Sequence, residues 1–190
     1  MSKKRLLASM TVVIVLLLGC TSSFSTYIDN MYWGRNLLRQ RQYEKSRERF
    51  LVANEYQPAA VALAFAGVAS YKMGDLQGAD QYLTTAQAID GQTDAYIVIF
   101  GYKALILFAE GERNEGLMAL NAYIAACRNV QPISPSMKDT EFNITYGRYP
   151  PSASLKPVEA MVSSGQIDIR LLEQLIDQQI NESEIVYNRL

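Results

Sequence analysis

The stretch GVASYKMGDLQGADQYLTTA, residues 67–86, decides the fold of this chain. In its middle, Gly74 and Asp75 are typical of a helix stop followed by a helix start, because glycine adopts the left-handed turn and aspartate caps the next helix. The stretch therefore predicts two helices, over 58–73 and 76–90, that are joined by a tight turn. Small residues where the helices cross would let them pack closely.

Helix pairs of the same kind precede and follow this stretch. Gly34 aligns with Gly67 at a spacing of 33 positions, and Gly74 aligns with Gly111 at a spacing of 37. A repeat of this length is typical of stacked helix hairpins. The same registers align Ser46, Phe50 and Ala53 with Ala79, Leu83 and Ala86, and then with Gly116, Leu120 and Tyr123. The remaining helices are expected over 27–41, 43–55, 93–110 and 113–128.

The pattern resembles the tetratricopeptide (TPR) repeat, which has small residues at the helix crossing and a Leu or aromatic residue one turn later. The resemblance covers residues 27–128, and the third unit is degenerate because Tyr123 replaces its last small residue. It implies an all-α fold of antiparallel helix pairs, stacked as a short superhelix of about three units with a C-terminal capping helix. An all-α bundle with chance spacing of Ala and Gly is the alternative. The matching positions are Gly34, Tyr43, Ser46, Phe50, Ala53 and Pro58, then Gly67, Gly74, Ala79, Leu83 and Ala86, then Ala104 and Gly111.

The amino terminus has the layout of a secretory signal. Lys3, Lys4 and Arg5 precede an uncharged apolar run over 6–18, and the small residue Gly19 follows it. As a helix of about 13 residues this run would span roughly 20 Å. A transmembrane helix crosses a hydrocarbon core of roughly 30 Å, so residues 1–19 are expected to be a signal peptide that is removed.

The motif LLGC, residues 17–20, resembles the bacterial lipobox, Leu-x-(Gly/Ala)-Cys. The resemblance implies that residues 20–26 form a lipidated tether, and more than one acyl chain makes such an anchor stable. Thr21 after the cysteine, where Asp would imply inner-membrane retention, implies the outer membrane facing the periplasm if the source is Gram-negative. An ordinary signal peptide or anchor with a chance cysteine is the alternative. The lipobox resemblance implies that Leu17, Leu18 and Gly19 guide processing, and that Cys20 carries diacylglycerol and an acyl chain such as palmitate.

Composition argues against several function classes. The chain has 18 Lys and Arg against 19 Asp and Glu, and loss of the signal leaves 15 against 19, which disfavours a nucleic-acid binder. It contains no His, the commonest general base and metal ligand. Once Cys20 is acylated, Cys127 has no intramolecular partner, so neither a disulfide framework nor a zinc site is expected. We expect no enzyme activity, no metal and no cofactor apart from the covalent lipid.

The chain changes character after residue 128. Residues 129–154 contain four prolines and are expected to form a long loop with a weak strand signal over 141–146. Residues 155–190 return to helix, over 156–164 and 168–181. The last helix has an apolar stripe and suits a terminal cap of the repeat stack, and folding back to fill the groove is the alternative.

The resemblance also indicates a candidate partner-binding surface. In this family, side chains of the first helix of each unit line the concave face. Here Arg35, Arg39 and Lys72 would form a basic patch edged by Tyr71, which suits an extended acidic or carboxy-terminal peptide. The alternative is that these cations only keep the surface soluble. The full set is Met31, Arg35, Leu38 and Arg39, then Val68, Tyr71 and Lys72, then Leu105 and Phe108.

Together these features predict a membrane-anchored lipoprotein scaffold that binds a protein partner in the bacterial cell envelope through a TPR-like groove. An assembly factor for an envelope complex belongs to this class. The alternative is a structural or accessory envelope lipoprotein whose groove is occupied by its own tail and takes no peptide ligand. The position of the last helix distinguishes the two.

Overall fold

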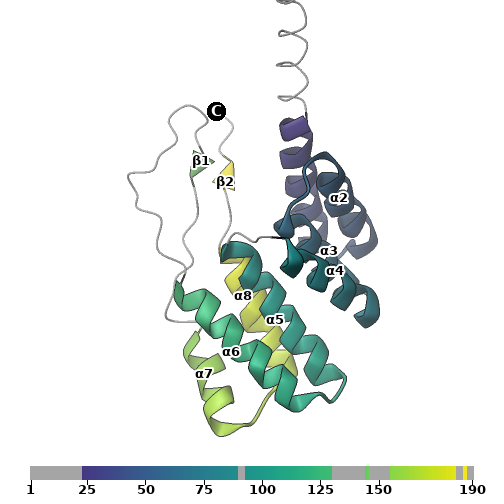
Figure 1. Ribbon diagram of the computed structural model, residues 1–190. Coiled ribbons are helices and arrows are strands. Elements are labelled where there is room, and N and C mark those ends of the chain that lie inside the picture. The colour runs from purple at the N-terminus through teal and green to yellow at the C-terminus, as the bar shows by residue number, and fades with distance from the viewer. Residues whose placement is uncertain (1–22, 90–92, 130–143, 146–154, 183–185, 188–190) are drawn as a thin grey trace, which may run out of the picture.

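A computed structural model describes residues 23–89, 93–129, 144–145, 155–182 and 186–187. Within these residues the protein is all-α apart from one short strand pair, and its helices pack as sequential antiparallel pairs (Figure 1). The first helix covers residues 23–39, and residue 23 is the first that the structure describes. The other elements are α2 (Tyr43–Tyr56), α3 (Ala60–Lys72), α4 (Leu76–Ala88), α5 (Thr93–Ala109), α6 (Arg113–Asn129), β1 (Ile144–Thr145), α7 (Leu155–Ser164), α8 (Ile169–Glu182) and β2 (Val186–Tyr187).

Every predicted helix is present, and apart from the start of the first helix each end lies within two residues of its expected position. Residues 23–26 of the expected tether belong to the first helix, which therefore begins before residue 27, its expected start. Of the predicted strand over 141–146, residues 144–145 pair antiparallel with β2. The rest of that strand and of the loop over 129–154, from residue 130 onward, lies outside the described residues, as do the signal peptide and Cys20. None of the described helices is both long and apolar enough to cross a bilayer.

The first three helix pairs share one turn geometry. In the second pair the backbone N–H of Asp75 donates to the carbonyl of Ser70 at 3.0 Å, and Gly74 has a φ of +82°. This is a Schellman turn, in which a left-handed residue lets the backbone satisfy the last helical carbonyls. The same bond joins Gln42 to Leu37 at 2.9 Å and Glu112 to Leu107 at 2.8 Å, and the left-handed residues are Arg41 at +59° and Gly111 at +82°.

Arg41 is the exception in this series, because it adopts the left-handed conformation with a side chain present. Such a backbone costs a non-glycine residue roughly 1 kcal/mol. Arg41→Gly is therefore expected to raise the free energy of unfolding by about 0.5–1 kcal/mol, as measured by urea denaturation. Gly74→Ala, the reverse change at the matching position, should lower it by a similar amount. A loss of stability in Arg41→Gly would show that the arginine side chain contributes more than the strain removes.

Close crossing of the helices explains the small residues that recur along the chain. A Cβ placed on Gly67 would lie 2.8 Å from Leu83 Cγ and 3.2 Å from the carbonyl oxygen of Ala79. In the first pair, a Cβ on Gly34 would lie 2.6 Å from the Phe50 ring. The register predicted from the sequence therefore places the right residues at both crossings. The aligned residues of the three pairs are buried, namely Gly34, Ser46 and Phe50, then Gly67, Ala79 and Leu83, then Ala104, Gly116 and Leu120.

Gly67→Leu is expected to lower the free energy of unfolding by about 1–3 kcal/mol, because the new side chain must force α3 and α4 apart. Thr84→Leu is the matched control, since Thr84 is exposed on α4 beside Leu83. That change should alter stability by no more than about 0.5 kcal/mol in the same denaturation experiment. Equal effects of the two substitutions would mean that the crossing lies elsewhere.

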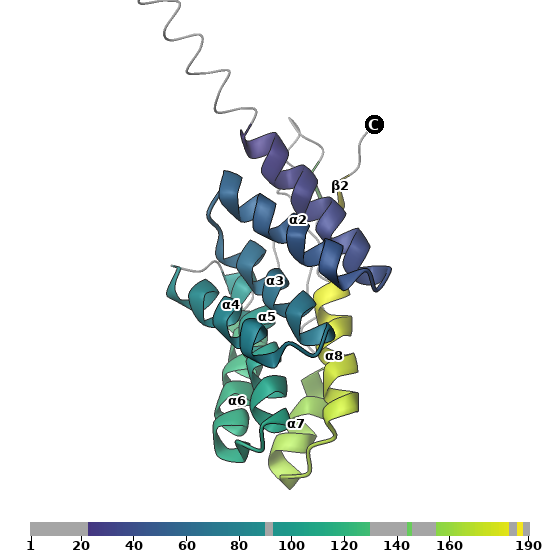
Figure 2. The same cartoon turned by 90° about the vertical axis from the view of Figure 1, so that its right-hand side faces the viewer.

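The central helices α3 and α5 are apolar around most of their circumference, which is typical of helices that are covered on all sides. Helix α3 packs against α2, α4 and α5, and α5 packs against α3, α4, α6 and α8 (Figure 2). Their side chains form nearly half of the buried core among the described residues. The first members of the second and third pairs thus lie in the interior of the molecule, and the C-terminal helix α8 packs against α5.

Candidate functional site

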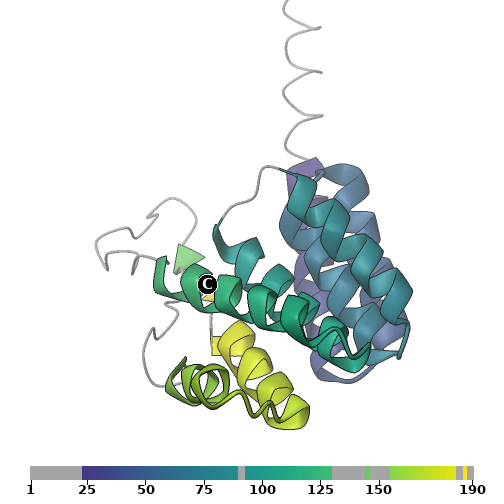
Figure 3. The same cartoon turned by 60° about the horizontal axis from the view of Figure 1, so that its bottom comes forward.

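Helix α8 lies against the face that the sequence suggested for partner binding. We call this the inner face, and it is formed by the first helix, α3 and α5. Figure 3 shows α7 and α8 as a hairpin lying against α6 and α5. A Cβ on Gly101 of α5 would lie 3.0 Å from Ile176 Cγ2, and Arg35 of the first helix donates to the Ile180 carbonyl at 3.3 Å. Helix α8 thus packs on α5 and α7 and reaches α3 and the first helix through the side chains of Lys72 and Arg35.

The sequence of α8 explains why it docks in this way. Leu172, Ile176 and Ile180 recur every four residues, so they fall on one side of the helix, and all three are buried. The Asp168 side chain accepts from the backbone N–H groups of Arg170 and Leu171 at 3.0 and 3.1 Å, which caps the amino terminus of the helix. The helix therefore starts at a defined place and presents an apolar side to the inner face.

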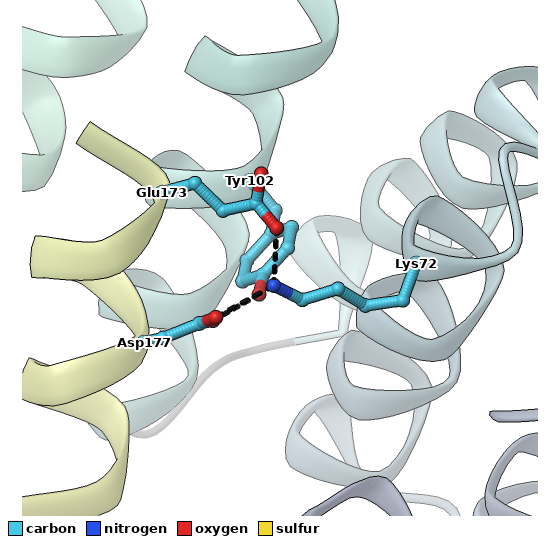
Figure 4. Close-up of polar contacts among 4 residues, drawn as sticks. All are labelled: Lys72, Tyr102, Glu173 and Asp177. Carbon is cyan, nitrogen blue, oxygen red and sulfur yellow. Dashed lines mark hydrogen bonds and ion pairs between the residues drawn. The ribbon is translucent and has the colours of Figure 1, made fainter. Parts of the chain in front are cut away.

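Beside this apolar contact lies a cluster of charged and phenolic side chains (Figure 4). Lys72, at the end of α3, donates to Asp177 Oδ2 at 2.6 Å and also bonds to Glu173 Oε1. The hydroxyl of Tyr102 on α5 donates to the other oxygen of Asp177. The Tyr71 ring meets the Tyr102 ring edge to face, with centroids 5.2 Å apart. The cluster thus joins α8 to α3 through the Lys72 ammonium group and to α5 through the Tyr102 hydroxyl.

The electrostatics of the cluster keep Lys72 protonated and both tyrosine hydroxyls neutral. Burial alone would lower the pKa of Lys72, but hydrogen bonds to Asp177 and Glu173 and their charges outweigh it and raise that pKa above its ordinary value. Burial, followed by the charges of Glu173 and Asp177, raises the pKa of Tyr71 to about 12. Burial and then Asp177 hold the pKa of Tyr102 well above its ordinary range. At neutral pH the lysine is therefore protonated and both phenols are neutral.

These shifts predict that the protein loses stability at alkaline pH. Each group has a higher pKa in the folded than in the unfolded state, so its contribution is complete below about pH 10 and declines as the pH rises through the folded pKa. The melting temperature should fall more steeply between about pH 10 and 12 in the native protein than in Tyr71→Phe. Tyr32→Phe, at an exposed tyrosine, should leave the slope unchanged. Equal slopes in all three proteins would contradict the placement of Tyr71.

A pocket of about 400 Å³ opens where the carboxyl end of α8 meets the turn of the first helix pair. Basic residues lie on the side of the first pair, and the carboxylates of the cluster lie on the side of α8. The lining includes apolar side chains from three helices. The lining residues are Leu38, Arg39, Arg41, Tyr43, Val68, Lys72, Glu173, Asp177, Ile180 and Asn181.

The structure places the four candidate partner-binding residues near one another but does not leave them as an open basic patch. Lys72 is in the cluster, and Tyr71 packs against it. The Arg35 guanidinium lies 4.8 Å from the centroid of the Phe65 ring, beside the end of α8. Arg39 bonds to the Asn36 side chain and lines the pocket. Arg35 and Lys72 therefore contact α8. Of the four residues, Arg39 and Lys72 line the pocket.

Sequence reasoning missed the partners of Lys72. Glu173 lies 101 positions from it and Asp177 lies 105 positions from it, so no local pattern connects them. One signal was present, because two acidic residues four positions apart share a side of the amphipathic helix next to its apolar stripe. Cys127 is buried and unbridged, and burial raises the pKa of its thiol to about 11, so it is a poor nucleophile at neutral pH.

Comparison with known proteins does not assign a family. No protein-family model matches the chain, and no curated protein matches it either. The helix pairing therefore stands on the geometry described above. The TPR and lipoprotein assignments rest on the residues that carry those resemblances.

Proposed function

We propose that this protein is a lipid-anchored, non-catalytic scaffold of the bacterial envelope, built from a TPR-like stack whose inner face is filled by its own helix α8. The lipobox-like motif over 17–20 supports the anchor, with Cys20 as the acylated residue and the outer membrane as the location in a Gram-negative cell. The recurring Schellman turns and tight crossings support the TPR-like stack.

The contact of α8 with the inner face is the observation that carries this proposal. A TPR-like groove that holds an extended peptide needs free side chains on the first helix of each unit. Here Lys72 is taken up by Glu173 and Asp177, and Ile176 packs against Gly101. These contacts favour the accessory scaffold with a self-occupied groove over an open peptide receptor.

The chemistry of the cluster supports a non-catalytic role. A lysine that serves as a general base needs a pKa lowered towards neutrality, whereas the pKa of Lys72 is raised. The phenols of Tyr71 and Tyr102 have raised pKa values and are poor bases at neutral pH. A structural role, in which these contacts hold α8 on α3 and α5, accounts for the arrangement.

The anchor is tested by intact mass and membrane fractionation of the native protein beside Cys20→Ser and Cys127→Ser. The proposal expects a native mass that matches a chain starting at an acylated Cys20, in the membrane fraction. Cys20→Ser should be unprocessed or released, and Cys127→Ser should behave as the native protein. A native mass equal to the full unmodified chain, or a soluble mature chain starting elsewhere, would overturn the lipoprotein assignment.

A further inference from the structure

The outer side of the first helix carries a stripe of aromatic and apolar side chains. Phe24, Ile28 and Tyr32 recur every four residues, so they share one side of the helix. Phe24 is 55% exposed, Tyr32 is 50% exposed and Ile28 is half-buried. Trp33, which is 55% exposed, meets the Tyr32 ring edge to face with centroids 5.6 Å apart. We call these four residues the aromatic stripe.

The repeat register explains why this side of the helix is uncovered. Tyr32 aligns with Phe65 at the spacing of 33 and then with Tyr102 at the spacing of 37. Both of these rings are buried against the preceding pair, where Phe65 stacks on Phe50 and Tyr102 packs on Tyr71. No helix pair precedes Tyr32 among the described residues. The terminal unit of a repeat stack normally has a polar outer face, so exposed rings at this place indicate that another surface covers them.

The proposed anchor lies close to the stripe along the chain. Only residues 21 and 22 separate Cys20 from residue 23, which is already helical. Even a fully extended chain would span only about 10 Å over these three steps. Figures 1 and 2 show the first helix (purple) at the end of the molecule farthest from α7. A lipid on Cys20 would therefore hold this end, and the stripe with it, beside the bilayer.

The chemistry of the stripe suits the surface of a bilayer. Trp and Tyr have an apolar ring and a polar tip, and both are enriched at the level of the lipid headgroups. The acidic residue Asp29 lies next to the stripe on the same helix. Attraction to anionic lipid therefore does not explain a contact here, and burial of the apolar rings does.

We propose that the first helix lies along the surface of the membrane that holds the anchor, with Phe24, Ile28, Tyr32 and Trp33 inserted at headgroup level. The inference rests on the proposed lipid anchor and adds a second membrane contact to it. The lipid on Cys20 holds the chain at the bilayer, and the stripe fixes the orientation of the folded body.

The test reconstitutes the native acylated chain in phosphatidylcholine vesicles, with and without bromine on the lipid acyl chains. Trp33 is the sole tryptophan of the chain, so its fluorescence reports on the stripe alone. A helix rises about 13 Å from Phe24 to Trp33, so an upright helix would hold Trp33 away from the acyl chains. A helix that lies along the surface brings the ring within reach of the bromine. We expect brominated lipid to reduce the Trp33 emission by about half or more.

Two variants serve as controls. Trp33→Phe combined with Met118→Trp moves the sole tryptophan to an exposed place on α6, which packs against α5 and α7. Brominated lipid should leave its emission nearly unchanged. Tyr32→Glu should at least halve the quenching of Trp33, because a charge replaces a ring of the stripe. Its melting temperature in detergent should equal that of the native protein, since Tyr32 is exposed.

Unquenched emission from Trp33, or equal quenching at Met118→Trp, would overturn the proposal. So would blue-shifted Trp33 emission that brominated lipid does not quench, which would assign the stripe to a second protein molecule. Flotation and intact mass of the same sample report on the anchor. An acylated chain that floats with the vesicles but keeps Trp33 unquenched would refute the stripe and leave the anchor standing. A quenched Trp33 in an unacylated chain would do the reverse.

Discussion

Replacing Ile176 with Asp is expected to lower the free energy of unfolding by roughly 4 kcal/mol or more and to release α8 from the inner face. Ile176 is 0% exposed and packs against Gly101, so the substitution removes a buried apolar side chain and leaves a charge without a partner in its place. Urea denaturation measures the loss of stability. Hydrogen exchange then shows whether the amides of α8 lose protection before those of α3 and α5.

The matched control is Leu171→Asp, on the same helix. Leu171 is 41% exposed, so the same charge there remains in water and should change stability by no more than about 0.5 kcal/mol. Both variants place Asp on α8, so the comparison separates the effect of burying the charge from the effect of Asp on helix propensity. If both variants kept native stability and native exchange rates in α8, the helix would not be docked as described.

Phe50→Ala should lower the free energy of unfolding by about 3–5 kcal/mol, which is the usual cost of removing a buried aromatic side chain. Phe50 is fully buried where the first helix and α2 cross, and its ring stacks on Phe65 of α3 with centroids 5.2 Å apart. It therefore joins the first helix pair to the second. Because a cavity there would loosen both contacts, thermal and urea unfolding should both report the loss.

Tyr56→Ala is the control for that change, because Tyr56 is an exposed aromatic residue on the same helix. Its removal should cost well under 1 kcal/mol. A small effect of Phe50→Ala, close to that of Tyr56→Ala, would mean that the first helix pair does not pack on the second through this ring.

Most of the fold could be predicted from the sequence, because local chemistry decides where these helices stop and cross. Gly74 and Gly111 end helices, and the small residues Gly34, Gly67 and Ala79 are needed where two helices come within contact distance. The turn at Arg41 was not recognised, since glycine is the usual signal for a left-handed residue and here it is absent. The same backbone geometry forms without it.

The candidate site was predicted only in part, and the reason is the distance along the chain. Lys72 bonds to Glu173 of α8, and the Tyr71 ring packs against Tyr102 of α5. Their environment depends on α8, which returns to α3 from more than a hundred positions away. The amphipathic pattern of α8 indicates that it must bury one side, but it does not indicate against which helix. The contacts of α8 with α3 and α5 therefore required the structure.

The central claim is that α8 fills the inner face, and a double-mutant cycle between Lys72 and Asp177 tests it most directly. Lys72→Met, Asp177→Asn and the double variant are compared with the native protein by urea denaturation. The side chains of Glu173 and Asp177 are 29% and 36% exposed, so a modest coupling energy of about 1 kcal/mol is expected for the pair. Effects that add within about 0.3 kcal/mol would show that α3 and α8 do not meet there, and would contradict the self-occupied face.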